Sequence, residues 1–544
     1  MPERKHIGVV TEGSLAEGLK VRLDALASVE EMRVGSFVVV QGQHKDFFCL
    51  VSDVALEATN AQVLMDPPAG NEAFTRQVLN GTSIFGSVAL APMLMLEQEA
   101  TEEDSGLRPV RTIPSHFSAA FIANEDDFKT VFGLEEGTKI EIGRPLDMDV
   151  PVCIDLEKFV ERSNGIFGKS GTGKSFLARL LLAGIIKTNV ASNLIFDMHN
   201  EYAWETQDEQ KRTFVKGLRQ LFGAKVSVFS LDPEVSRKQG VSVDYEIKIG
   251  LNQIEAADIL LLQDELQLSA TAATQADLLV GVYKDKWITS LLDMGGEGMR
   301  AFVEEHGGHE GALGSLQSRL RRIENLGFIE REAEASSIES MINVLDQGRH
   351  VVLQFGRYGR LLEYILVANI LTRRIHRHYQ DKTDEYLMTK DAAKRPHQLM
   401  ITIEEAHKFL NPQAAGQTIF GTIAREMRKY HVTLMIIDQR PSGIDSEVLS
   451  QIGTRVTAAL NDERDIDAVF TGVTGGGHLR SMLATLDPKQ QALVMGYALP
   501  MPVVVRIRAY DEAFYRAIGA EVALSKEERA AKALQDKDDI FGKE

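Results

Sequence analysis

Hydrophobic residues in the first 150 positions occur in short runs that are separated by turn residues. The runs are Ile7–Val10, Leu19–Leu23, Ser36–Gln41 and Phe47–Val54. Short runs at this close spacing predict the β-strands of a small barrel or sandwich. We therefore expect residues 1–150 to form an N-terminal β-domain, and we see no catalytic group of polar residues within it.

The pattern changes near Pro151, where apolar runs begin to alternate with helical stretches. Most of these runs are continuously apolar, as in parallel strands that are covered on both faces. They are Asn164–Phe167, Asn193–Phe196, Val226–Phe229, Val351–Phe355, Leu399–Ile403, Thr433–Ile437 and Gln491–Met495. The predicted fold class for residues 151–510 is therefore α/β, a parallel sheet with helices on both sides.

Strand-like runs are missing between about residues 254 and 343. In that region Ala256–Asp264, Gln275–Leu292 and Ser315–Asn325 have helical periodicity. We interpret the region as a helical insertion into the α/β domain. Residues 511–544 are predicted to form a C-terminal tail, whose last part, Ser525–Glu544, is highly charged.

Composition and charge narrow the class of protein. Apolar residues make up 44% of the chain and charged residues 25%, as in soluble globular proteins. The polar start is not followed by the apolar core of a signal peptide, and no run is long enough to cross a membrane, so we expect a cytoplasmic protein. With 60 basic and 78 acidic residues the formal charge is −18. Any nucleic acid must therefore meet basic groups gathered in a groove or pore.

The most specific motif is Gly168-Lys169-Ser170-Gly171-Thr172-Gly173-Lys174-Ser175, a complete match to the phosphate-binding loop G-x-x-x-x-G-K-S/T. An apolar strand precedes it and the apolar helical run Phe176–Ile186 follows it, which makes a chance glycine-rich turn a poor alternative. Backbone N–H groups and the positive end of the helix dipole would surround phosphate oxygens. We expect Lys174 to reach the β- and γ-phosphates of ATP and Ser175 to bind Mg²⁺. The predicted nucleotide-binding residues are Gly168, Ser170, Gly171, Thr172, Gly173, Lys174, Ser175 and Phe176.

Two carboxylates follow another apolar strand. Leu399–Ile403 leads directly into Glu404 and Glu405, which places both at the edge of the sheet where the phosphates would bind. We assign Glu404 to the metal, and Glu405 to the orientation and deprotonation of the attacking water. The alternative is a helix N-terminus whose acidic residues interact favourably with the helix dipole.

Two further strand ends carry polar residues. Asp197 follows Asn193–Phe196 and is a candidate for the metal and water network, with His199 and Glu201 beside it. Alternatively, Asp197 and its neighbours are strand-end polar residues that cap a turn. Gln439 follows another strand and is placed to sense the γ-phosphate; alternatively it belongs to a turn before Pro441.

Arg425 and Arg428 are three residues apart in a predicted helix and therefore share one face. In a ring ATPase, such an arginine can reach the nucleotide of the neighbouring subunit and neutralise transition-state charge. The alternative is a solvated helix face with local partners such as Glu426.

These motifs, in this order, resemble the HerA family of hexameric DNA translocases, within the FtsK–HerA group of ATPases. The resemblance rests on Ile142–Pro145, Gly168–Ser175, Phe196–Tyr202, Glu404–His407, Ala424–Lys429 and Gln439–Ser442. It implies a HerA-type barrel at the N-terminus, a RecA-like core that holds the insertion, and a C-terminal tail that braces a neighbouring subunit. Lys174, Asp197, Glu405 and one of Arg425 or Arg428 match the family's ATPase positions. Met427 departs from the glycine that is frequent there.

The resemblance implies an ATP-driven motor that moves along double-stranded DNA as a homohexameric ring. Its partner would be a nuclease of the NurA type or another effector, in DNA end resection or in phage defence. Two alternatives stay open at this point. One is a secretion or conjugation ATPase that moves protein or single-stranded DNA, and the other is a ring scaffold whose nucleotide site serves the assembly of an effector.

Overall fold

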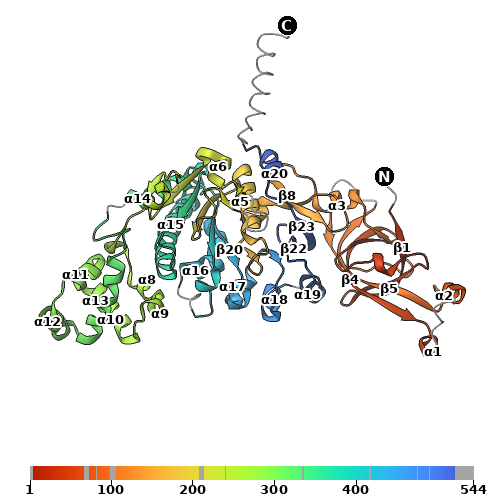
Figure 1. The fold of residues 1–544 in the computed structure, drawn as a ribbon, viewed down its shortest axis with the longest axis horizontal. Coiled ribbons are helices and arrows are strands. Elements are labelled where there is room, and N and C mark those ends of the chain that lie inside the picture. The colour runs from red at the N-terminus through yellow and green to blue at the C-terminus, as the bar shows by residue number, and fades with distance from the viewer. Residues whose placement is uncertain are drawn as a thin grey trace, which may run out of the picture.

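Two β-sheets organise the chain, an N-terminal barrel and a twelve-stranded sheet (Figure 1). The computed structural model describes residues 4–520 apart from 66–72, 81, 99–105, 208–213, 239, 334–335, 414, 416–417, 474–475 and 489. None of the helices in these ranges is long and apolar enough to cross a membrane. The predicted segment Ser525–Glu544 lies outside the described residues.

The barrel has six antiparallel strands, in the order β2-β1-β7-β3-β4-β5, and it closes by pairing of β2 with β5. These are β1 (His6–Ser14), β2 (Gly18–Leu23), β3 (Phe37–Gln41), β4 (Lys45–Ala58), β5 (Ile84–Glu97) and β7 (Ala119–Ile122), with the short β6 (Arg108–Pro109) attached outside on β5. All four strands predicted from the first apolar runs are present. Of the two architectures considered, barrel and sandwich, the structure has the barrel.

Strand β3 shows why parts of the barrel are apolar on both faces. Val38 and Val40 belong to the cluster that fills the barrel. Phe37 and Val39, which point the other way because side chains alternate along a strand, belong to the main core of the α/β domain. The outer wall of the barrel therefore packs on the second domain, which explains a continuous apolar run where a solvent-facing barrel strand would alternate.

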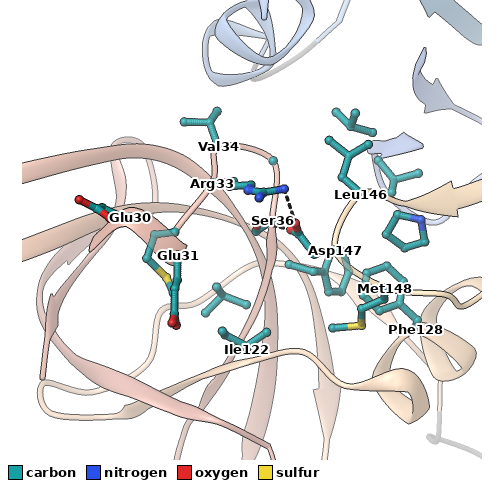
Figure 2. Close-up of a pocket in the computed structure, with 17 residues that line it drawn as sticks. Glu30, Glu31, Arg33, Val34, Ser36, Ile122, Phe128, Leu146, Asp147 and Met148 are labelled. Atoms are coloured by element: carbon teal, nitrogen blue, oxygen red, sulfur yellow. Dashed lines mark hydrogen bonds and ion pairs between the residues drawn. The ribbon is translucent and has the colours of Figure 1, made fainter. Parts of the chain in front are cut away.

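The seam between the two domains contains a cavity of about 290 Å³ (Figure 2). The ring of Phe37 lies 4.7 Å from that of Phe128 in helix α3 (Glu125–Phe132), measured between centroids. At the rim, the Ser36 hydroxyl donates to Asp147 at 2.6 Å, and Arg33 pairs with the same carboxylate at 3.2 Å (Figure 2). Apolar packing and this polar clamp together hold the barrel on the α/β domain.

The large sheet has the order β15-β14-β18-β11-β19-β20-β10-β21-β22-β23-β8-β9. Its parallel part, from β15 to β21, consists of β15 (Tyr245–Glu246), β14 (Val226–Ser230), β18 (His350–Gln354), β11 (Ser192–Asp197), β19 (Leu399–Glu404), β20 (Val432–Asp438), β10 (Asn164–Phe167) and β21 (Thr454–Ala458). The remaining strands, β22 (Gln491–Gly496), β23 (Val503–Ile507), β8 (Lys139–Pro145) and β9 (Val152–Asp155), pair in antiparallel fashion. All seven predicted core strands are present, but Gln491–Met495 was wrongly expected to be parallel.

Five strands of this sheet were not predicted, namely β8, β9, β15, β21 and β23, and β21 and β8 show why. β21 contains Arg455 and two threonines, Thr454 and Thr457, so it lacks a continuous apolar signal. Arg455 is nevertheless buried, because its guanidinium donates to the carbonyl oxygens of Val469, Leu449 and Thr471. β8 lies before residue 150 but pairs with β23, so the large sheet begins earlier in the chain than the change in composition suggested.

Helices cover the sheet and extend from it. α5 (Lys174–Thr188) packs on β10 and β11, α14 (Ser336–Asp346) on β11 and β18, and α16 (Ile419–Glu426) on β20. The long α15 (Leu361–Thr389) carries the helices of the insertion region: α8 (Ala256–Leu261), α9 (Gln263–Leu266), α10 (Ala270–Tyr283), α11 (Trp287–Asp293), α12 (Gly296–His306) and α13 (Glu310–Glu324). These helices and the barrel lie at opposite ends of the molecule (Figure 1).

Candidate nucleotide-binding site

The predicted phosphate loop lies between β10 and α5, as the motif requires. Gly171 and Gly173 have φ angles of 76° and 90°, a left-handed conformation that glycine adopts without the penalty of a side chain. The loop is anchored to its neighbours, since the Lys169 N–H donates to the Ala459 carbonyl at 3.1 Å and the Thr172 hydroxyl donates to the Lys169 carbonyl at 2.8 Å. The loop is thus a fixed turn at the N-terminus of a buried helix, where backbone N–H groups favour anions.

Lys174 lies in the first turn of α5, with its ammonium folded back onto the loop. Its Nζ atom donates to the Lys169 carbonyl at 2.9 Å. Burial lowers the pKa of Lys174, while the nearby carboxylates, Glu405 first among them, raise it. A phosphate oxygen is a stronger acceptor for this ammonium than a carbonyl oxygen, because it is charged.

A cavity of about 360 Å³ opens above the loop. Nine predicted residues line it: Ser170, Gly171, Gly173, Lys174, Ser175, Phe176, Glu404, Glu405 and Gln439. They come from the loop and from the ends of β19 and β20, which are neighbours in the parallel sheet. The structure therefore brings together segments that are about 230 residues apart in the sequence. Gly168 and Thr172 contribute to the base of the loop.

Glu404 is a buried acid with one oxygen unused. Its Oε1 atom accepts a hydrogen bond from the Tyr202 hydroxyl at 2.8 Å, whereas Oε2 is buried and has no hydrogen-bond partner among the described residues. Burial raises the pKa of Glu404 to about 8. Glu404 lines the cavity above the phosphate loop, and a buried carboxylate oxygen that lacks a partner fits a divalent cation. Within the described ranges no cluster of three or more His, Cys, Asp or Glu forms a separate metal site, and Mg²⁺ in such sites takes most of its ligands from phosphates and water.

Glu405 is held from both sides. Its Oε1 atom accepts from the Gln439 amide at 3.3 Å, and its Oε2 atom is 3.7 Å from Nδ1 of His407. Its backbone is left-handed, with a φ of 50°, an uncommon conformation for a residue with a side chain. Strain of this kind is concentrated at functional sites. The carboxylate proposed to act on water is thus pre-positioned at the cavity wall.

Asp438 and His407 are the functional candidates that the sequence analysis missed. Asp438 is buried and accepts from the backbone N–H of His407 at 2.7 Å and from that of Arg440 at 2.7 Å. It also lines the cavity. The signal was available, because Asp438 ends an apolar strand next to the strand that ends in Glu404, and acids at neighbouring strand ends meet at one edge of a parallel sheet.

Asp197 lies outside the cavity. It is fully buried, and its two oxygens accept from the backbone N–H groups of Glu201 at 2.7 Å and Tyr202 at 3.0 Å. This geometry matches the alternative reading, a strand-end residue that caps a turn, and burial raises the pKa of Asp197 to about 6. Its effect on the site is indirect, since the turn it holds carries His199 and Glu201 into the cavity wall.

Arg179 was also missed, although it lies on α5 one turn after Ser175. Only 2% of its surface is exposed, and its guanidinium donates to the Thr206 hydroxyl at 2.7 Å and to the Glu201 carbonyl. It therefore ties the turn after β11 to the helix that follows the phosphate loop. A charged residue within an apolar helical run was the signal for it.

Arg425, a candidate arginine whose side chain the structure describes, is not among the described residues that line this cavity. The Arg425 guanidinium donates to the Gly421 carbonyl at 3.1 Å and to the Ala415 carbonyl, and it is 3.5 Å from Glu447. Arg428 belongs to the 3₁₀ turn Met427–Tyr430, and its side chain lies outside the described part of the chain. The contacts of Arg425 are those of a residue that holds the loop before α16.

Two protein-family models match the chain, and together they account for more than half of it. The model of the HerA helicase central domain matches residues 140–375, and the HAS barrel domain matches residues 7–111. The chain belongs to the HerA helicase family. The predicted HerA resemblance is thereby confirmed, and the chain is a P-loop ATPase of the helicase type.

Relatives of known function carry the same family name. The chain is 24% identical to the DNA double-strand break repair helicase HerA of Pyrococcus furiosus over 75% of this chain and 76% of that protein. It is 24% identical to the HerA of Sulfolobus acidocaldarius over 94% of this chain and 95% of that protein. Similar solved structures include VirB4 of Thermoanaerobacter pseudethanolicus, which is 17% identical to this chain and has a TM-score of 0.44. The match covers 70% of this chain and 98% of VirB4. The bacterial conjugative coupling protein TrwB is 13% identical to this chain and has a TM-score of 0.45. That match covers 71% of this chain and 92% of TrwB.

Proposed function

We propose that this HerA-family chain is an ATP-driven motor that moves along double-stranded DNA as a homohexameric ring. The observation that carries the proposal is the convergence of Lys174, Glu405 and Gln439 on one cavity above the phosphate loop. This set has a group for phosphate, a base for water and an amide at the γ-phosphate position, which phosphoryl transfer needs. The relatives named DNA double-strand break repair helicases support DNA as the polymer.

Within the site, each residue has a separate task. The loop N–H groups and Lys174 bind the phosphates. The Ser175 hydroxyl and Glu404 would hold Mg²⁺, which when bound would neutralise charge on the phosphate oxygens. Glu405, held by Gln439 and His407, orients the attacking water and accepts its proton. In this arrangement Glu404 must be ionised, and the cation favours that form despite the burial that opposes it.

The ring is proposed because Arg425, the candidate arginine whose side chain the structure describes, is not among the described residues that line the cavity. A neighbouring subunit would supply the arginine, so that ATP is hydrolysed only where two subunits meet. With a charge of −18 per chain, the ring must gather basic side chains in its channel, and DNA binding should weaken steeply with salt. A NurA-type nuclease or another effector is the expected partner, in end resection or phage defence.

The substitution Lys174→Ala tests the proposal. We expect ATP turnover to fall by about 100-fold to 1,000-fold with the fold intact, and stimulation by double-stranded DNA to disappear with it. Lys169→Ala is the matched control, because Lys169 lies in the same loop but its ammonium points to Asn461 at 3.2 Å. Native mass spectrometry should find a hexamer. Retained turnover in the Lys174 variant, or a monomer with full turnover, contradicts the proposal.

A further inference from the structure

Two buried tyrosines hold Glu404, and each holds a different part of it. The Tyr202 hydroxyl, from the turn after β11, donates to the Oε1 atom of the carboxylate at 2.8 Å. The hydroxyl of Tyr364, on α15, accepts from the backbone N–H of Glu404 at 3.1 Å and donates to its carbonyl at 3.3 Å. Neither tyrosine is exposed to solvent. Tyr202 therefore fixes the side chain of Glu404, whereas Tyr364 fixes its backbone.

The ring of Tyr202 is itself held in place. The backbone N–H of Tyr202 donates to Asp197 at 3.0 Å, and its carbonyl accepts from the backbone N–H of Leu218 at 2.8 Å. The guanidinium of Arg179 lies 5.9 Å from the centre of the ring. Because the ring is buried in a close-packed core, its hydroxyl stays in place when a neighbouring carboxylate rotates. The hydrogen bond therefore restricts Glu404 to one orientation of its two oxygens, and the turn that Asp197 caps contributes to this restriction.

The two oxygens of Glu404 are not equivalent toward a cation. Oε1 is engaged by Tyr202, whereas Oε2 is buried without a hydrogen-bond partner among the described residues. Glu404 lines the cavity above the phosphate loop, and Tyr202 is not among the described residues that line it. The tyrosine therefore contacts the carboxylate from the protein interior. Glu404 thus has one free oxygen for a cation, while the protein occupies the other.

Negative charge in the cavity does not by itself select among divalent cations. Three further acids, Glu201, Glu405 and Asp438, line the same cavity, and their charge attracts Mg²⁺ and Ca²⁺ alike. The two ions differ in the ligands that they take. Ca²⁺ binds about six to eight oxygens and can take both oxygens of one carboxylate, whereas Mg²⁺ requires a near-octahedral set and keeps several waters. A carboxylate with a single free oxygen therefore suits Mg²⁺ better than Ca²⁺.

We propose that Tyr202 is a positioning residue that sets the cation preference of the nucleotide site. By engaging Oε1, it leaves Glu404 with one oxygen for the cation, and this favours Mg²⁺ over the larger Ca²⁺. Tyr202 itself does not contact the cation. The inference rests on the proposed function, because it takes Glu404 to be part of the Mg²⁺ site. It extends that function by giving a residue outside the cavity lining control over which ion the site accepts.

The substitution Tyr202→Phe tests the proposal, because it removes the hydroxyl and keeps the ring. The readout is the binding of a fluorescent, non-hydrolysable ATP analogue, measured as a function of Mg²⁺ and, separately, of Ca²⁺. We expect the ratio of the half-saturating Ca²⁺ concentration to that of Mg²⁺ to fall about tenfold, since outer partners of metal ligands have effects of this size. Tyr364→Phe is the matched control, because it removes the other buried hydroxyl that contacts Glu404 but leaves the bond to the carboxylate intact. Its ratio should equal the wild-type ratio.

A second variant breaks the same hydrogen bond from the other side. Glu404→Asp shortens the side chain by one methylene and withdraws the carboxylate from the Tyr202 hydroxyl. The ratio should fall in this variant as well, and adding Tyr202→Phe to it should cause no further fall, because the bond is already absent. Melting temperatures establish that each variant is folded. If Tyr202→Phe does not fold, the Glu404→Asp ratio decides, and an unchanged ratio there overturns the proposal.

The outcomes separate this proposal from the proposed function. A wild-type ratio in Tyr202→Phe overturns the proposal, even if both half-saturating concentrations rise by the same factor, because the tyrosine then has only a structural role. An equal fall in Tyr364→Phe also overturns it, since the bond to the carboxylate is then not the cause. Glu404→Gln tests the metal assignment of the proposed function. If it changes neither half-saturating concentration, that assignment and this proposal both fail; if it weakens Mg²⁺ while Tyr202→Phe keeps the ratio, only this proposal fails.

Discussion

The Nδ1 atom of His407 lies 3.0 Å from an oxygen of Asp438. Asp438 also accepts two backbone N–H groups, so its carboxylate acts as an acceptor, and Nδ1 of His407 is the protonated donor. The same Nδ1 atom is 3.7 Å from Oε2 of Glu405. His407 thus connects the end of β20 to the carboxylate that is proposed to activate water at the end of β19.

We predict that His407→Ala lowers kcat for ATP hydrolysis by about tenfold, since partners of catalytic groups have effects of this size. The KM for ATP should stay close to the wild-type value, because His407 is not in the cavity wall. His407→Asn should recover most of kcat, since its amide N–H can replace Nδ1. Steady-state kinetics check this, and equal kcat values for wild type and His407→Ala would remove the positioning role.

The two candidate arginines should behave differently. Arg425→Ala is predicted to lower the melting temperature, because Arg425 holds the carbonyl oxygens of Gly421 and Ala415. Arg428→Ala should lower ATP turnover without that loss of stability. Mixed with Lys174→Ala subunits, Arg428→Ala should regain part of the turnover, since some seams then combine an intact Lys174 with an intact Arg428. Absence of any recovery, with mixed hexamers verified by native mass spectrometry, counts against an arginine that acts between subunits.

Glu404 should make the nucleotide-free protein less stable as pH rises. Its pKa is raised from 4.5 to about 8 by burial, so between these values the folded state holds a proton that the unfolded state has lost. Unfolding then becomes easier with increasing pH across this window. Glu404→Gln removes the titration, so its melting temperature relative to wild type should increase from pH 5 to pH 8.

The control for this prediction is magnesium with a nucleotide analogue. It should stabilise the wild-type protein but not Glu404→Gln, if Glu404 contributes to the cation site. A melting-temperature difference that is constant with pH would show that Glu404 ionises normally in the folded protein.

The helical insertion should depend on one buried ion pair. Asp258 of α8 accepts from Arg373 at 2.5 Å and from Asn369 at 2.6 Å, both on α15. Asp258→Ala leaves the Arg373 charge partly unpaired and should cost about 3–5 kcal/mol. Hydrogen exchange of amides in α8–α11 measures this as a lower local opening free energy. Glu265→Ala, an exposed acid on the next helix, should change it by less than about 0.5 kcal/mol. Equal effects of the two variants would contradict the prediction.

The lining of the cavity above the phosphate loop was largely predictable because its residues come from a few short segments. The loop needs eight consecutive residues, and the acids at Glu404 and Glu405 need only a preceding apolar strand. Neighbouring parallel strands end at the same edge, so residues from the loop, from β19 and from β20 meet in one cavity. The same reasoning named Gln439 but omitted Asp438, although both line the cavity. It also made Asp197 a candidate for the site, whereas in the structure the oxygens of Asp197 accept hydrogen bonds from backbone N–H groups and cap a turn.

The amino-acid sequence by itself determined four strands of the barrel, six strands of the parallel part of the large sheet, the helical insertion and the phosphate loop, because each follows from the periodicity or the chemistry of adjacent residues. Only the tertiary structure decided which partners distant segments have. The pairing of β8 with β23, the packing of Tyr510 beside Phe176 and the bond between His407 and Asp438 each depend on how the whole core closes. Contacts between segments that are far apart in the chain leave no regular pattern in either segment, which is why the sequence by itself did not predict these contacts.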